Sequence, residues 1–167
     1  PPMTERRRRL YFDTSAYLCI LLAEEGAERL SEESDGAELL TSALLLLEAR
    51  RNLIRLAREG TLKADYYKAC MDRVEQDAAL FAIRDLTIDL CGAHPLPAVA
   101  TPRTLDLAHL RTALWFHGDR PLDRFVTTDA AQRAGARRTR FGNLAARHGS
   151  LEGGWRADMA LGVLRSA

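Results

Sequence analysis

The chain has 167 residues, a formal net charge of +1 and hydrophobic residues at 47% of its positions. This length suits one domain that buries its own core, and the near-neutral charge excludes a chain that is strongly basic throughout. No stretch reaches the ~20 apolar residues that a membrane-spanning helix needs. Cys19, Cys70 and Cys91 lack metal-site spacing and are expected to be reduced core thiols of a cytoplasmic protein.

Strand-like and helical segments alternate along the chain. The expected strands are 10–13, 37–41, 80–85 and 125–128. The expected helices are 15–23, 26–34, a long helix that Thr41 or Ser42 caps and that ends near Arg58, then 61–74, 87–91 and 104–115. Gly60 suits the position just after the long helix. This alternation predicts a single α/β domain over residues 1–167, with a parallel central sheet and helices on both of its faces.

Carboxylates stand where this topology would gather ligands. Asp13 and Asp129 end the first and last expected strands, and ligands of open parallel sheets bind beyond the carboxyl ends of the strands. Asp106 lies in the first turn of an expected helix, and Glu48 follows four leucines near the start of another. All four could therefore face one edge of the sheet. Oxygen ligands without His or Cys favour Mg²⁺ or Mn²⁺ over zinc.

Each acid also has an ordinary explanation when it is taken alone. Asp13 and Asp129 could cap helices, and Asp106 could be a charge that suits a helix N-terminus. Glu48 could form an ion pair with Arg51 one turn away. The four together favour a metal site, because carboxylates in apolar surroundings are costly unless something compensates them.

The order of these segments resembles the PIN domain family, and within it the VapC-type toxins of bacterial toxin–antitoxin pairs. The matching blocks are Tyr11-Phe12-Asp13-Thr14-Ser15-Ala16, then Thr41-Ser42 with Glu48 downstream, then Arg103-Thr104-Leu105-Asp106-Leu107-Ala108-His109-Leu110, and Phe125-Val126-Thr127-Thr128-Asp129. They define a family-like core over residues 8–130, whereas residues 131–167 form a divergent C-terminal segment. Between the last two blocks, residues 116–123 look like a long loop insert in which Asp119 and Asp123 are loop charges.

The resemblance implies a Mg²⁺- or Mn²⁺-dependent endoribonuclease whose catalytic and metal-binding residues are Asp13, Glu48, Asp106 and Asp129. The hydroxyls of Thr14, Ser15 and Thr127 would orient those carboxylates or bound water. His109, three residues after Asp106, is expected to pack or to form hydrogen bonds and not to bind metal. The resemblance further implies an RNA substrate, a cognate antitoxin, a homodimer and a cytoplasmic location.

A basic segment follows the last carboxylate. Residues 130–151 contain five arginines and no acid, and Arg133, Arg137, Arg138 and Arg140 are candidates for contacts with RNA. A solvated surface would explain the same composition.

Other classes of protein share parts of this pattern. A haloacid-dehalogenase-like phosphatase would need a second Asp two residues after Asp13, where Ser15 stands. A response-regulator receiver would need paired acids after its first strand and a late lysine, whereas the only lysines are Lys63 and Lys68. A catalytically silent PIN-like interaction module stays open, because intact ligands do not prove turnover.

Overall fold

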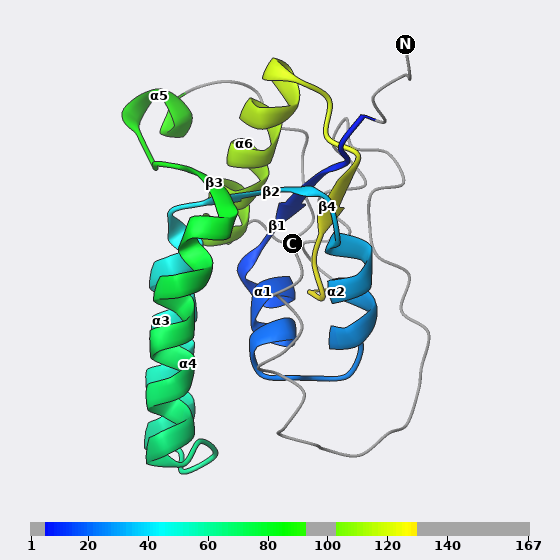
Figure 1. Ribbon diagram of the computed structural model, residues 1–167. Coiled ribbons are helices and arrows are strands. Elements are labelled where there is room, and N and C mark those ends of the chain that lie inside the picture. Colours follow the sequence, from blue (N-terminus) through cyan, green and yellow to red (C-terminus); the bar gives the residue numbers. More distant parts are fainter. Residues whose placement is uncertain (1–5, 93–102, 130–167) are drawn as a thin grey trace.

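A computed structural model describes residues 6–92 and 103–129 (Figure 1). The strands are β1 (Arg9–Phe12), β2 (Glu38–Ser42), β3 (Phe81–Arg84) and β4 (Arg124–Val126). The helices are α1 (Thr14–Leu21), α2 (Ala27–Ser34), α3 (Leu44–Arg58), α4 (Ala64–Asp77), α5 (Ile88–Cys91) and α6 (Thr104–Asp119), with a 3₁₀ turn at Ala78–Leu80. All strand pairs are parallel, in the order β3-β2-β1-β4. The α/β class predicted from the alternation is confirmed.

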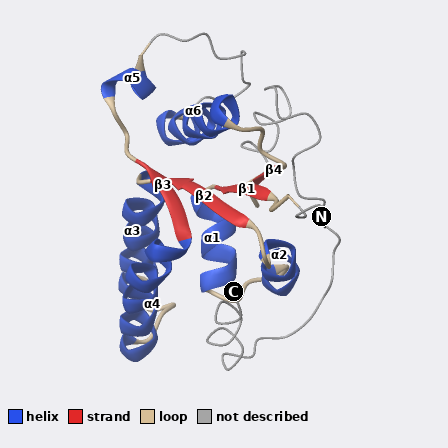
Figure 2. Cartoon of the chain, turned by 45° about the horizontal axis from the view of Figure 1, so that its top comes forward, coloured by secondary structure: helices blue, strands red, loops and turns tan. Residues whose placement is uncertain are grey.

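Helices cover both faces of the sheet, as Figure 2 shows. Alternate residues of β1 point to opposite faces. Tyr11 packs with Leu110 and Phe116 of α6, whereas Leu10 and Phe12 belong to the core that α1 and α2 share with the sheet. β1 is buried along its whole length, as expected of a central parallel strand. The hairpin of α3 and α4 closes a further core against α1. In the part of the chain that the structure describes, no helix is long and apolar enough to cross a bilayer.

The predicted turn after α3 is confirmed. Gly60 has a φ of 74°, a left-handed conformation that costs glycine little. The amides of Thr61 and Leu62 then bond the carbonyl of Leu56, so α4 begins only at Ala64 and not near residue 61. At the other end, the N-cap of α3 is Ala43, which makes no side-chain cap bond, and not the expected Thr41 or Ser42. Ser42 lies one residue earlier and accepts a hydrogen bond from the Leu44 amide over 3.3 Å.

The expected loop over residues 116–123 is wrong in its first half, because residues 116–119 belong to α6. The helix runs to Asp119 because Phe116 packs in the core beneath it. Asp123 is also more than a loop charge, since its carboxylate accepts a hydrogen bond from the Arg9 amide over 2.8 Å. Cys91 corrects a further expectation, because this thiol is exposed and not in the core.

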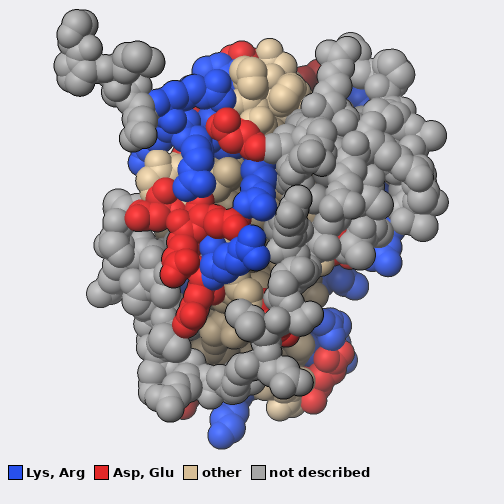
Figure 3. All heavy atoms as spheres, turned by 90° about the vertical axis from the view of Figure 1, so that its right-hand side faces the viewer, with Lys and Arg blue, Asp and Glu red and all other residues tan. Residues whose placement is uncertain are grey.

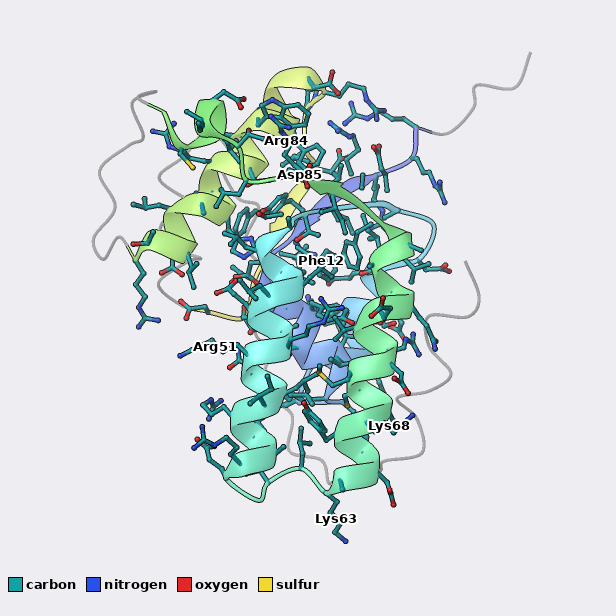
Figure 4. The ribbon with its side chains drawn as sticks, turned by 90° about the vertical axis from the view of Figure 1, so that its left-hand side faces the viewer. Phe12, Arg51, Lys63, Lys68, Arg84 and Asp85 are labelled. Atoms are coloured by element: carbon teal, nitrogen blue, oxygen red, sulfur yellow. The ribbon has the colours of Figure 1, made fainter. Side chains whose placement is uncertain are left out.

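Ion pairs tie the amino end of the sheet to the helices around it. The buried Arg9 pairs with Glu38, which also binds the exposed Arg120. Arg124 at the start of β4 pairs with Glu33 of α2. Figure 3 shows the resulting surface, on which acidic and basic side chains interleave. This edge is charge-matched and lies opposite the edge at which the carboxylates were expected.

Candidate functional site

The carboxyl ends of β1 and β4 meet at Asp13. Phe12 is paired with Val126, and the Asp13 amide bonds the Val126 carbonyl over 3.1 Å. Asp13 then begins α1 as its N-cap, with Oδ1 accepting from the Ala16 amide over 3.0 Å. The strand thus delivers a carboxylate to the sheet edge, and the helix N-terminus stabilises its charge.

Two hydroxyls fix the orientation of this carboxylate. Ser15 donates to Oδ1 over 2.8 Å, and Thr127 donates to Oδ2 over 2.5 Å. Asp13 is only 2% exposed, so burial raises its pKa, although the Thr127 hydroxyl and the charge of His109 act in the opposite direction. A buried acid with a raised pKa, held in one orientation by its neighbours, is a candidate for a functional residue.

Glu48 projects from α3 into a second hydrogen-bonded group. Its Oε2 atom accepts from the Thr14 hydroxyl over 2.5 Å and contacts His109 Nε2 over 2.9 Å. Burial alone would raise the pKa of Glu48, but the hydrogen bonds from His109 and Thr14 outweigh it and hold that pKa below its ordinary value. The charge of Arg51 acts in the same direction. Among the described residues, the basic side chain in direct contact with the Glu48 carboxylate is His109 and not Arg51.

Asp106 connects the acids electrostatically. It lies half-buried in the first turn of α6, and burial raises its pKa above the ordinary value. The negative charge of Asp129 raises this pKa further, as do those of Asp13 and Glu48, while Arg103 opposes them. The negative charges of Asp13, Glu48 and Asp129 therefore act on Asp106 from three other segments of the chain.

Asp129 is attached to the same edge through its backbone. Its amide donates to Thr127 Oγ1 over 3.1 Å and to Ser15 Oγ over 3.3 Å. The hydroxyls that orient Asp13 thus also fix the chain at the point where Asp129 emerges. The candidate RNA contacts Arg133, Arg137, Arg138 and Arg140 lie outside the described residues.

The acidic residues are of the chemical type that binds a divalent cation, but their side chains do not surround a common position for one. Within residues 6–92 and 103–129, no three Asp, Glu, His or Cys side chains converge closely enough to hold a metal ion as they stand. The oxygen donors suit Mg²⁺ or Mn²⁺, and a cation would relieve the repulsion that raises the pKa of Asp106. Binding would require side chains such as those of Asp106 and Asp129 to move toward Asp13.

Sequence reasoning missed Tyr11. Its hydroxyl lies 2.9 Å from His109 Nδ1, so both ring nitrogens of this histidine have partners. Tyr11 stands within the apolar first strand, and its ring packs in the core. The available signal was the phenol itself, because a buried tyrosine hydroxyl usually requires a hydrogen-bonding partner.

Comparisons with known proteins add little to this geometry. No family model matches the chain. No curated protein matches it either. Among solved structures, it is similar to PAE2754 from Pyrobaculum aerophilum, with 18% identity and a TM-score of 0.48 over 86% of this chain and 92% of that one. We draw nothing about function from this likeness.

Proposed function

We propose that this chain is a PIN-like, Mg²⁺- or Mn²⁺-dependent endoribonuclease that serves as the toxin of a VapBC-type toxin–antitoxin pair. One observation carries the proposal of a metal site. The hydroxyls of Ser15 and Thr127 hold the buried Asp13 carboxylate at the carboxyl ends of β1 and β4, and they also accept from the Asp129 amide. The charges of Asp129, Asp13 and Glu48 in addition raise the pKa of Asp106 on α6, which burial also raises. Acids that repel one another at the carboxyl edge of a parallel sheet form a typical site for a divalent cation.

The residues of the chain have distinct parts in this proposal. Asp13 would hold the cation in an orientation set by Ser15 and Thr127, and Glu48 would do so in an orientation set by Thr14. A bound divalent ion lowers the pKa of water and neutralises charge on a phosphodiester. Water as the attacking group leaves a 5′-phosphate and a 3′-hydroxyl, whereas attack by the ribose 2′-hydroxyl would leave a cyclic phosphate.

The biological setting in the proposal rests on the resemblance of the sequence blocks. It comprises an RNA substrate, a cognate antitoxin that neutralises the enzyme, a homodimer and a cytoplasmic location. The arginines after Asp129 would supply contacts to RNA phosphates.

A second candidate is a catalytically silent PIN-like interaction module. The Glu48 carboxylate is already bonded to Thr14 and His109, as a purely structural acid would be. The described carboxylates also do not converge without side-chain movement. These two features favour the silent module over an acidic-site phosphatase, for which Ser15 occupies the position of the required second Asp.

A cleavage assay separates the two candidates. The full chain is incubated with total cellular RNA in Mg²⁺, in Mn²⁺ and in EDTA, and the product ends are identified. We expect metal-dependent cleavage that Asp106→Asn abolishes. Asp72→Asn serves as the matched control, because Asp72 is exposed on α4 and paired with Lys68. Intact cleavage by Asp106→Asn, or tight metal binding without any cleavage, would reject the ribonuclease assignment.

A further inference from the structure

A buried chain of hydrogen bonds runs from the central strand to the acid on α3. The Tyr11 hydroxyl lies 2.9 Å from His109 Nδ1, and His109 Nε2 lies 2.9 Å from Glu48 Oε2. Tyr11 is 0% exposed and His109 is 2% exposed. Their rings meet edge to face, with centroids 6.0 Å apart. Three elements, β1, α6 and α3, are thus linked through buried polar groups, and the Thr14 hydroxyl also lies 3.1 Å from His109 Nε2.

The partner of each nitrogen fixes the histidine ring. An ionised carboxylate can only accept hydrogen bonds, so His109 Nε2 must carry a hydrogen and donate it to Glu48, whatever the state of Nδ1. A ring flip would break this bond and the bond to Tyr11 together, in a place with little access to water. The imidazole therefore has one orientation and one protonated nitrogen facing α3.

The consequence for Glu48 is an asymmetric carboxylate. Among the described residues, the hydrogen bonds to this side chain all fall on Oε2, from Thr14 and from His109. Two donors on one oxygen restrict the rotation of a long side chain and leave Oε1 for another ligand. A ligand then meets a side chain that is already ordered, which lowers the entropic cost of binding.

We propose that His109 is a positioning residue, held in place by Tyr11, which orients Glu48 so that Oε1 is presented to the cation. This inference rests on the proposed function, because it takes Glu48 as a ligand. Tyr11 and His109 would then do more than pack in the core, because residues that hydrogen-bond to a metal ligand set the orientation of that ligand and thereby the affinity for the metal.

Mn²⁺ affinity of the full chain, measured by titration calorimetry, tests the proposal without relying on cleavage. The first variant is His109→Leu, which removes the hydrogen-bond donor to Glu48. The second is Tyr11→Phe, which removes the hydroxyl that contacts His109 Nδ1. Tyr17→Phe is the matched control, because it removes a buried tyrosine hydroxyl that contacts Asp77 in a different core cluster. Nitrogen NMR of the histidine ring reports the protonated nitrogen directly.

We expect His109→Leu to weaken Mn²⁺ binding by roughly 10–100-fold, the range typical of lost outer partners. Tyr11→Phe should weaken it by several-fold, and Tyr17→Phe should leave it unchanged. His109→Gln, whose amide can donate to Glu48, should recover part of the loss. If His109→Leu fails to fold, as its thermal melt would show, the conservative Tyr11→Phe carries the test.

The outcomes separate this inference from the proposed function. Wild-type Mn²⁺ affinity in both Tyr11→Phe and His109→Leu, or in Tyr11→Phe alone if His109→Leu does not fold, would overturn the positioning role while leaving the metal site intact. A neutral ring protonated at Nδ1 instead of Nε2 would overturn it as well. A wild-type chain that binds no Mn²⁺ would overturn the metal site of the proposed function, and the positioning role with it.

Discussion

Replacing Asp13 by Asn separates the charge of this carboxylate from its hydrogen bonds. The Asn carbonyl can still accept from the Ala16 amide and the Ser15 hydroxyl, which lie 3.0 and 2.8 Å from Oδ1. The Asn amide faces Thr127, whose hydroxyl can turn and accept. Because the substitution also removes a buried charge, we expect the metal-free unfolding free energy to stay within about 1 kcal/mol of the wild type or to rise.

Asp13→Ala provides the contrast, because it removes the hydrogen bonds as well. The loss of the N-cap of α1 costs about 1 kcal/mol. The Ser15 and Thr127 hydroxyls lose an acceptor but lie 3.2 Å from each other and can still form a hydrogen bond. We therefore expect Asp13→Ala to lose about 2 kcal/mol in total, clearly more than Asp13→Asn.

The raised pKa of Asp13 adds a dependence on pH with a definite sign. Burial makes the ionised form costly in the folded state, so this cost is present at pH 7 and disappears as pH falls through the raised pKa toward the ordinary value of 3.8. Metal-free wild type should gain stability relative to Asp13→Asn over that window, by about 1.4 kcal/mol for each unit of pKa shift. At about 100 times its Kd, Mn²⁺ should stabilise the wild type by about 2.7 kcal/mol and leave Asp13→Asn nearly unaffected.

Urea unfolding followed by circular dichroism at several pH values, together with thermal melts with and without Mn²⁺, measures all of these quantities. A loss above about 3 kcal/mol in Asp13→Asn would refute the reasoning, because the charge would then serve the fold. An unchanged Mn²⁺ shift in the same variant would show that Asp13 is not a ligand.

Three further predictions concern other parts of the chain. Glu48→Gln should weaken Mn²⁺ binding at least about tenfold in calorimetry with little effect on folding, and an unaltered affinity would make Glu48 a structural acid. Changing Arg137 and Arg138 together to Ala should lower RNA affinity in binding titrations and flatten its log–log salt slope by about 1 to 1.5; no change in either quantity would assign them to a solvated surface. Arg9→Met should cost about 2–3 kcal/mol in urea unfolding because it removes a buried guanidinium that bonds to the partly exposed Glu38. A cost as small as the about 0–1 kcal/mol expected for exposed Arg120→Met would contradict this.

Local chemistry made much of the fold predictable. The alternation of strands and helices gave the parallel sheet, and Gly60 marked the end of α3 because few other residues adopt its backbone conformation. The end of α6 was missed, because the helix was expected to stop at Trp115, whereas Phe116 is held by the tertiary core and the helix continues to Asp119. Pattern reasoning cannot weigh a packing contact whose other side lies on distant strands.

The acids and their hydroxyl partners Thr14, Ser15 and Thr127 were named from the sequence, whereas the link from Tyr11 through His109 to Glu48 was not. A carboxylate that ends an apolar strand, or that follows four leucines, interrupts a run of apolar residues and is therefore easy to recognise in a sequence. Tyr11 and His109 do not stand out, since an aromatic residue suits a buried strand and a histidine suits a helix. Tyr11 and His109 are 98 residues apart in sequence, and their hydrogen bond forms only because α6 packs against β1 in the folded chain. Partners that lie next to an acid in sequence, such as Thr14 and Ser15, can be proposed from the local motif, whereas a partner on a distant element is found only from the three-dimensional structure.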